Sequence, residues 1–512
     1  MLQSHLRVFW PIFILASMTL ALTDSINPIL PGWNPDPTIL RVGSDYFIAT
    51  STFEYFPGHP IYHSTNLVDW ELIGHALNKP SQLSLFGTPS DADELRLFPR
   101  SFFVTTTDIF SNEWSDPVYF DALGYDADLF WDINGDVYNT WSGINNAIDK
   151  IYGIYQNKID ITTGNSLTPA ELIFTGTLPD NSSARPEGPH IYLINSTYYL
   201  LIAEGGSGPA HQSTIQRGPS PSGPWENNPA NPILFNGANL SLPVQYTGHA
   251  DIVQAPSGEW WGVALGVRPQ TEGDFDHIQL GVELPDKAHL STFYDDFSSS
   301  SSSTFDNSYY FLRTPYKPFH SLTTRPGFLR LLANAYALGD RDSPALILRK
   351  QTSYVERFET VLDFMPNSNL TEAGATVFYG DFAHNDIGVM GGADGGGERF
   401  IVTRLIRPAE QVGPWALTTT NSTVTTITYT PLSTKSDPVK LVIVGNSTSY
   451  SLGFSEGTYT DLDAVEITYT ATFDSVSMSV MPVKFFHSMS ISLLLIPSTP
   501  PPFADYARST QH

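Results

Sequence analysis

Residues 125–142 read YDADLFWDINGDVYNTWS, and this stretch decides the fold because its pattern occurs four times. An ionisable residue leads a short apolar strand, a turn of Gly, Asn or Ser follows, and the second strand is rich in aromatic or β-branched residues. The other copies are PDPTILRVGSDYFIAT (35–50), PEGPHIYLINSTYYLLIAEGG (186–206) and TGHADIVQAPSGEWWGVALG (247–266). Hairpins repeated at such intervals predict a β-propeller.

The leading residues of the four copies are Asp36, Asp126, Glu187 and His249. In a propeller the inner strands of all blades converge on one axis, so we expect these side chains to meet. A lone Asp before a strand is more often a turn residue, and a lone His is more often structural. The shared position within the repeat is what favours a joint site.

The intervals between the copies indicate five blades, of which the second is incomplete. Sixty-one residues separate Asp126 from Glu187, and sixty-two separate Glu187 from His249. The ninety residues from Asp36 to Asp126 are too many for one blade and about 30 too few for two. Residues 102–120, which read FFVTTTDIFSNEWSDPVYF, look like the outer strands of the second blade.

A second domain follows the propeller, which we assign to residues 27–290. The serine run Ser298–Ser303 indicates a surface segment. Beyond it, strands such as ALILRK, FETVLDF, ATVFYG, VKLVIVG and YSLGFS alternate without a repeated leading acid, which predicts an antiparallel β-sandwich over 291–500. The fold class is therefore all-β.

Composition and the N-terminus indicate an extracellular protein. Residues 1–23 have the charge, apolar run and small residues of a secretory signal peptide; a membrane anchor is the alternative, but the run is short for a span. Six Asn-x-Ser/Thr sequons suggest glycosylation; they begin at Asn181, Asn195, Asn239, Asn369, Asn421 and Asn446. The net charge of −26 argues against nucleic acid as a partner, and we expect no membrane partner.

Three carboxylates and a His around one axis form an acid–base centre, for which glycoside hydrolysis is the obvious chemistry. An inverting glycosidase uses one carboxylate to activate water and one protonated carboxyl to donate to the leaving oxygen, roughly 6.5–9.5 Å apart. A third carboxylate near the acid raises its pKa by like-charge repulsion. Spacing alone does not distribute these roles among Asp36, Asp126 and Glu187.

Several motifs resemble glycoside hydrolase family 43, which contains β-xylosidases and α-L-arabinofuranosidases. They occur in the family's order over most of residues 27–270: NPDPTILRVGSDYFIATSTFEYFPG, GYDADLFWD, RPEGPHIY, YYLLIAEGG and TGHADIV. The resemblance implies a five-bladed propeller and hydrolysis with inversion. The second domain, from FYDDF onward, is similar to the concanavalin-like β-sandwich of xylosidase-like members.

The resemblance also implies residue roles. Asp36 matches the general base, Glu187 the general acid, and Asp126 the carboxylate that tunes the pKa of the acid and orients it. His249 matches a His at the floor of the pocket, which in some members helps hold a calcium ion or water. Phe53 matches an aromatic wall of the sugar subsite.

The implied function is secreted release of xylose or arabinose from xylan or xylo- and arabino-oligosaccharides, with no required cofactor and a structural Ca²⁺ as an option. For the STFEYFPG cluster around Phe53, core packing is the alternative reading. Asp128 falls where the family usually has Ser, and we leave it out of the site. Both sugar specificities, the pH optimum and the oligomeric state stay open.

The chain departs from the family pattern in three places. The Trp-Ala-Pro segment of blade two is absent, and DADELRLFPRSFF stands in its place; Val282 stands where an Arg contacts substrate; and the segment before FYDDF is short. Mis-joined exons or gene decay would produce such losses. They predict a poorly folded or weakly active chain, so a catalytically impaired carbohydrate-binding relative is the alternative function.

Overall fold

The computed structural model describes most of the chain as β-strands. The described residues are 27–84, 101–144, 152–179, 185–242, 244–267, 292–298, 305–340, 342–353, 355–381, 383–393, 397–408, 423–446, 449–463, 465–474, 490–496 and 503–511. Within them the helical structure is one 3-10 turn, Ile109–Ser111, and no helix is long and apolar enough to cross a bilayer. The all-β prediction is confirmed. Residues 1–23, Val282 and the sequons at Asn181 and Asn421 lie outside the described part.

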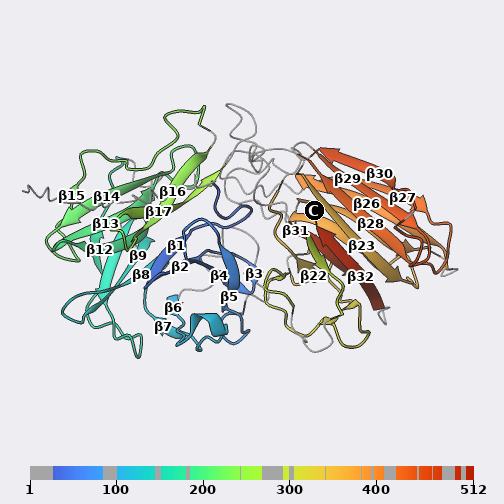
Figure 1. Ribbon diagram of the computed structural model, residues 1–512, viewed down its shortest axis with the longest axis horizontal. Coiled ribbons are helices and arrows are strands. Elements are labelled where there is room, and N and C mark those ends of the chain that lie inside the picture. Colours follow the sequence, from blue (N-terminus) through green and yellow to red (C-terminus); the bar gives the residue numbers. More distant parts are fainter. Residues whose placement is uncertain are drawn as a thin grey trace, which may run out of the picture.

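The N-terminal half consists of small antiparallel sheets arranged around an axis (Figure 1). The first contains β1 (Thr38–Val42), β2 (Asp45–Ala49), β4 (Gly58–Ser64) and β5 (Glu71–Leu77). The next four-stranded sheets are β8 (Gly124–Trp131), β9 (Val137–Ile144), β10 (Tyr152–Lys158) and β11 (Glu171–Phe174), and then β12 (Glu187–Ile194), β13 (Thr197–Glu204), β14 (Gln212–Gly218) and β15 (Glu226–Asn227). A pair, β16 (Gln245–Gln254) and β17 (Trp260–Val267), follows.

All four sequence repeats form the predicted antiparallel hairpins, β1–β2, β8–β9, β12–β13 and β16–β17. The β12–β13 hairpin shows how the turn residues favour this pairing. Asn195 and Ser196 both have positive φ, which is the conformation of a two-residue turn that matches the twist of the flanking strands. The first strand of each hairpin is the innermost. Going around the axis, β8 lies beside β12, β12 beside β16, and β16 beside β1.

Apolar residues hold neighbouring sheets face to face. Ile154 of β10 packs with Ile191 and Leu200 of the next sheet, and all three are almost fully buried. Ile48 of β2 packs with Val263 of β17, so the first and last sheets close the ring through their own core cluster. The innermost strands are therefore fixed relative to one another by burial of apolar surface.

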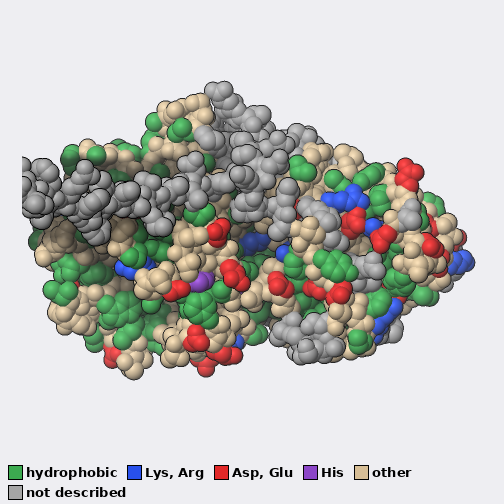
Figure 2. Space-filling view, in the orientation of Figure 1, with side chains coloured by type: hydrophobic (Ala, Val, Ile, Leu, Met, Phe, Trp, Pro, Cys, Tyr) green, Lys and Arg blue, Asp and Glu red, His purple; other side chains and the backbone are tan. Residues whose placement is uncertain are grey.

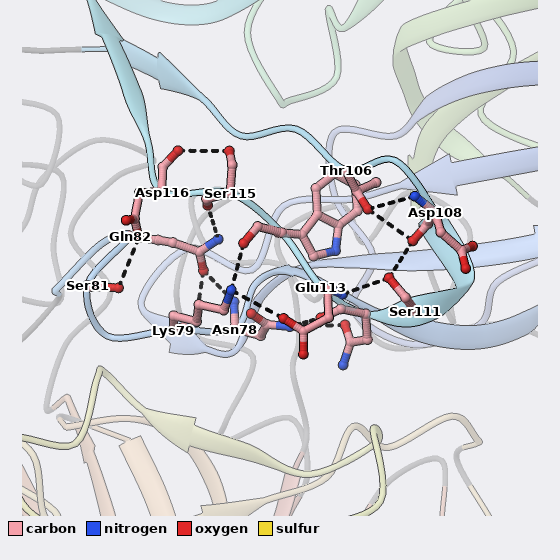
Figure 3. Close-up of polar contacts among 12 residues, drawn as sticks. Asn78, Lys79, Ser81, Gln82, Thr106, Asp108, Ser111, Glu113, Ser115 and Asp116 are labelled. Carbon is pink, nitrogen blue, oxygen red and sulfur yellow. Dashed lines mark hydrogen bonds and ion pairs between the residues drawn. The ribbon is translucent and has the colours of Figure 1, made fainter.

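Residues 101–120 form a short hairpin between the β1–β2–β4–β5 sheet and the β8–β11 sheet, made of β6 (Ser101–Phe103) and β7 (Val118–Phe120). One side packs through Val104, Ile109 and Trp114 against the first sheet, and Phe103 and Phe120 pack against Trp141 of β9. Figure 3 shows the polar side of this contact, where residues 78–82 meet residues 106–116. Lys79 Nζ donates to Trp114 O at 2.7 Å, and Gln82 Nε2 donates to Ser115 O at 2.9 Å.

The C-terminal half is a sandwich of two antiparallel sheets (Figure 1). One runs in the order β20 (His320–Ser321), β21 (Leu329–Leu332), β32 (Phe503–Gln511), β23 (Glu356–Phe364), β28 (Val439–Gly445), β29 (Ser449–Glu456), β30 (Thr468–Asp474), with β18 (Phe293–Asp295) on β32. The other runs β27 (Thr423–Pro431), β26 (Arg399–Pro408), β25 (Ala383–Gly391), β24 (Glu372–Gly380), β31 (Ser490–Ile496), β22 (Ala345–Leu348), β19 (Tyr310–Leu312) and β3 (Tyr55–Phe56). Buried residues such as Leu362, Val377 and Leu441 fill the space between them.

Two features of the sandwich differ from the expected plan. β32 lies past residue 500 and pairs with β21 and β23, so this sheet includes strand residues beyond 291–500. β3 comes from the propeller half yet pairs with β19, with Phe56 opposite Phe311 and Tyr55 opposite Leu312. One sheet is therefore continuous across the two halves.

Candidate active site

The backbone at the leading residues of the repeats is unusual. Asp36, Asp126 and His249 have φ of 51°, 54° and 47°, and Gly188, next to Glu187, has φ of 56°. Non-glycine residues rarely adopt positive φ, and such strain concentrates at functional sites. The register of β8, β12 and β16 shifts beside these residues. Bulges of this kind re-aim side chains, and here they accompany the residues of the repeat that were predicted to converge.

Contacts between neighbouring inner strands bring the four residues together. The Gly188 amide donates to Asp126 Oδ2 at 3.0 Å, which joins β12 to β8. His249 Nδ1 lies 3.5 Å from Asp36 Oδ1, which joins β16 to the segment before β1. Residues separated by more than 200 positions thus share one site. On the face drawn in Figure 2, acidic side chains and a histidine gather over the propeller half.

Gly188 makes room for the histidine. A Cβ built on Gly188 would lie 3.0 Å from His249 Nε2 and 3.1 Å from Cε1. The imidazole therefore fills the space directly over this glycine, between Glu187 and Asp36. Glu187 supplies a carboxylate to the site. Gly188, which has no side chain, leaves the space that the His249 ring occupies.

Burial and the charges of neighbouring groups raise the pKa values of Asp36 and Glu187 to different levels. Burial raises the pKa of Asp36 to about 6, with His249 opposing the shift and Asp126 adding to it. Burial raises the pKa of Glu187 to about 8, and the charges of Asp126 and Asp36 add to the shift against the effect of His249. Near neutral pH, Asp36 is thus the more ionised of the two and Glu187 the more protonated. The Asp36 side chain is still 28% exposed, so substrate and water can reach it.

The charges around His249 act on its ring. Burial acts to lower its pKa, but Asp36, Asp126 and Glu187 raise it above the usual value. Ca²⁺ takes six to eight oxygen ligands. Within the described ranges, no three His or acidic residues are grouped to hold a metal ion.

The aromatic cluster at residues 53–56 divides into two roles. Tyr55 and Phe56 are buried, at 5% and 8% exposure, and pack as core residues. Phe53 is 39% exposed, has φ of 47°, and its ring lies 5.4 Å from that of Trp33. Its exposed ring is available for stacking on a sugar, whereas its two neighbours are not.

A second tier of polar residues lies one step further along the same inner strands. The Thr38 and Tyr192 hydroxyls donate to Asp251 at 2.6 and 2.5 Å, and His190 Nδ1 lies 3.5 Å from Asp128 Oδ2. All five residues line a cavity of about 560 Å³. Burial acts to lower the pKa of His190, but Asp251 and Asp128 raise it to about 9. The sequence analysis missed this tier, although Thr38, Asp128 and Asp251 each follow a leading residue by two positions, which was a usable signal. His190 and Tyr192 do not keep this spacing, because the register shifts between Glu187 and His190.

Two further residues were missed, and the two places where the sequence predicts that pocket walls are absent lie outside the described residues. Tyr125 donates from its hydroxyl to Glu187 Oε2 at 3.3 Å, and Gly188 was not singled out. A Tyr directly before a leading Asp carried no distinguishing signal. The DADELRLFP stretch and Val282, where the family has pocket residues, lie outside the described residues.

Comparisons with known proteins agree on one family. The sequence profile of glycosyl hydrolases family 43 matches residues 25–280, and that of the beta xylosidase C-terminal Concanavalin A-like domain matches 294–474. The non-reducing end alpha-L-arabinofuranosidase BoGH43B of Bacteroides ovatus is 34% identical over 73% of this chain and 77% of its own length. Xylosidase/arabinosidase 43B of Humicola insolens is 33% identical over 73% and 78%. The crystal structure of xylan beta-1,4-xylosidase from Bacillus halodurans C-125 superposes with a TM-score of 0.81, at 26% identity, over 95% of this chain and 99% of that one.

Proposed function

The chain belongs to glycosyl hydrolases family 43 and is a glycosidase, and we propose that it releases xylose or arabinose from xylan-derived chains with inversion. The observation that carries this proposal is the convergence of Asp36, Asp126, Glu187 and His249. Two of the most similar curated relatives act as an arabinofuranosidase and as a xylosidase/arabinosidase by name.

We assign the general base to Asp36 and the general acid to Glu187. Pairs of titratable groups whose environments separate their pKa values identify acid and base, and the pKa of about 6 for Asp36 against about 8 for Glu187 supports this order. Asp126 raises the pKa of Glu187 by its negative charge and accepts from the Gly188 amide, so it tunes and orients the acid.

The reaction then needs no group beyond these side chains and water. Asp36 accepts a proton from a water molecule as the water oxygen bonds to the anomeric carbon. Glu187 gives its proton to the departing glycosidic oxygen as that C–O bond breaks. His249, whose pKa the neighbouring carboxylates raise, lies 3.5 Å from Asp36 at the floor of the site, and Phe53 forms an aromatic wall of the sugar subsite. Release of single sugars in this way corresponds to action on chain ends.

The remaining expectations extend the proposal to architecture and location. We infer a five-bladed propeller in which the β6–β7 hairpin represents a second blade without its inner strands; its packing between the β1–β2–β4–β5 sheet and the β8–β11 sheet supports this. We also infer secretion and glycosylation. The sequons at Asn195, Asn239, Asn369 and Asn446 support the latter because all four Asn residues are exposed.

Hydrolysis of aryl β-D-xyloside and aryl α-L-arabinofuranoside by the purified protein tests the function. We expect sugar release that falls by about 10²–10⁴ in a Glu187→Ala variant, because general acid catalysis is lost. The configuration of the first sugar released, followed by NMR, tests inversion. No release from either substrate by folded protein would instead support the carbohydrate-binding alternative.

A further inference from the structure

The segment that leads to Asp36 is in contact with the second domain. Gly32 has φ of 86°, and a Cβ on it would lie 2.6 Å from the carbonyl oxygen of Gln351. Only glycine allows the two backbones to approach this closely at that φ. The chain just before the proposed base therefore rests on the backbone that follows β22.

Trp33 continues this contact as a shared core residue. It is 5% exposed and packs in one cluster with Leu346 and Leu348 of β22 and with Phe378 of β24. These three partners belong to the sandwich, whereas Trp33 lies three residues before Asp36. Burial of a Trp side chain stabilises such a contact by about 3 kcal/mol or more.

Lys350 fixes the next residue, Asn34, through a hydrogen bond. Its Nζ donates to Asn34 Oδ1 at 2.7 Å, and the Tyr62 hydroxyl donates to the same oxygen at 2.8 Å. The Asn34 amide in turn donates to Pro31 O at 3.1 Å. Asn34 is thus held between the sandwich, β4 and its own loop.

The Lys350 amine is buried beside Asn34 and two tyrosine rings. Burial lowers the pKa of Lys350 to about 7, and its amine faces the Asn34 amide and the rings of Tyr62 and Tyr310. His75, the neighbouring titratable group, has its pKa lowered to about 3 by burial and is neutral. A neutral donor could therefore replace the amine.

These contacts reach both the proposed base and the proposed sugar wall. Pro35 O, adjacent to Asp36, accepts from the Ser51 amide at 2.9 Å, and the ring of Trp33 lies against Phe53. We propose that Lys350 of the second domain is a positioning residue for Asp36, acting through Asn34. The inference rests on the proposed function, since Asp36 is the base there.

The experiment compares Lys350→Met, which removes the donor, with Lys350→Gln, which keeps one. Lys440→Met is the matched control: Lys440 pairs with Glu359 at 2.8 Å and Asp463 at 3.1 Å, both within the sandwich and away from the base segment. For each variant, kcat and KM on the aryl glycosides are measured with and without sodium azide. Azide attacks the anomeric carbon without a general base, so it bypasses a misplaced Asp36.

We expect Lys350→Met to lower kcat on the order of ten- to a hundredfold with KM changed less than about threefold, because small misplacements of a catalytic group are costly. Azide should restore turnover, and Lys350→Gln should recover part of kcat. Lys440→Met should lower the melting temperature and leave kcat unchanged. An unchanged kcat in Lys350→Met, or a loss that azide does not restore, would overturn the inference.

Amide hydrogen exchange separates this inference from the proposed function. In Lys350→Met, and not in Lys440→Met, the amides of residues 30–36 should exchange faster. If the unmodified protein hydrolyses neither substrate, the proposed function fails, while faster exchange in this segment would still support the positioning contact. Equal exchange in both variants would refute that contact.

Discussion

The hydroxyl of Tyr125 donates a hydrogen bond to Oε2 of Glu187, across 3.3 Å between two neighbouring sheets. Tyr125 directly precedes Asp126, so a single bulged strand supplies both a hydrogen-bond donor and a negative charge to the same carboxyl group. The two act in opposite directions, because the hydrogen bond lowers the pKa of Glu187 and the charge raises it. Two residues adjacent in the sequence, Tyr125 and Asp126, therefore shift the pKa of Glu187 in opposite directions.

Removing the hydroxyl should shift the alkaline limb of activity. In Tyr125→Phe the ionised form of Glu187 loses a hydrogen bond, so the pKa of Glu187 rises further. We expect the alkaline limb of kcat/KM to move to higher pH by less than about one unit. The acid limb should stay in place, and a downward shift of the alkaline limb would contradict the contact.

The unmodified enzyme should show a bell-shaped pH profile. Asp36 must be ionised, so activity is lost as pH falls through its raised pKa of about 6. Glu187 must be protonated, so activity is lost as pH rises through about 8. The measured limbs belong to the coupled set rather than to single residues. An acid limb near about pH 4, the ordinary carboxyl range, would show that burial does not act on Asp36.

Gly188→Ala should damage the site beyond the cost of backbone strain. Its Cβ would press on the His249 ring at 3.0 Å, and φ is 56°. Gly135→Ala is the matched control, since Gly135 also has positive φ, 88°, but nothing within 4 Å of the added Cβ. We expect both variants to lose about 1 kcal/mol of unfolding free energy, and Gly188→Ala to lose further stability and more than about tenfold in kcat. Urea unfolding and kinetics on both variants check this, and equal kcat values would refute it.

Asn112→Ala tests the attachment of the β6–β7 hairpin region to the β1–β2–β4–β5 sheet. Asn112 Oδ1 accepts from the His75 amide at 2.9 Å and from Asn78 Nδ2 at 3.1 Å. The substitution should lower the free energy of unfolding by about 1–3 kcal/mol, because the partly buried His75 amide loses its acceptor, while Asn78 Nδ2 keeps its bond to the Asn112 carbonyl oxygen at 2.7 Å. Asn134→Ala, in the exposed β8–β9 turn, should cost about 0.5 kcal/mol. Equal losses in urea unfolding would show that residues 101–120 contribute little to stability.

The repeated hairpins were predictable because each copy carries its own local signals. A polar turn and an apolar strand of period two are encoded within about 16 residues, and all four copies fold accordingly. The last strands were not, because SISLLLI ends in the apolar run LLLI, which does not alternate and so does not indicate which face is buried. The place of β31 between β24 and β22 is set by pairing with strands that are distant in the sequence. The place of β32 is set by pairing with β21 and β23, which are distant from it in the sequence.

For the site, the shared position of the leading residues in the repeat predicted that they meet. The bulges at Asp126 and His249 could not be foreseen, since positive φ at Asp or His has no sequence marker. Asp128 was set aside by comparison with the family, yet it pairs with His190 in the second tier. Contacts of this kind depend on which strands become neighbours around the axis, and that is decided by tertiary packing.

The pairing of Tyr55–Phe56 with β19 has an evolutionary consequence. A module whose hydrogen bonds all lie inside its own borders keeps them when it is moved to another protein. Here the edge of one sheet is completed by two residues encoded more than 230 codons upstream. A sandwich transplanted onto another propeller would meet an unmatched edge, so the two halves are expected to be inherited as a pair and to diversify together.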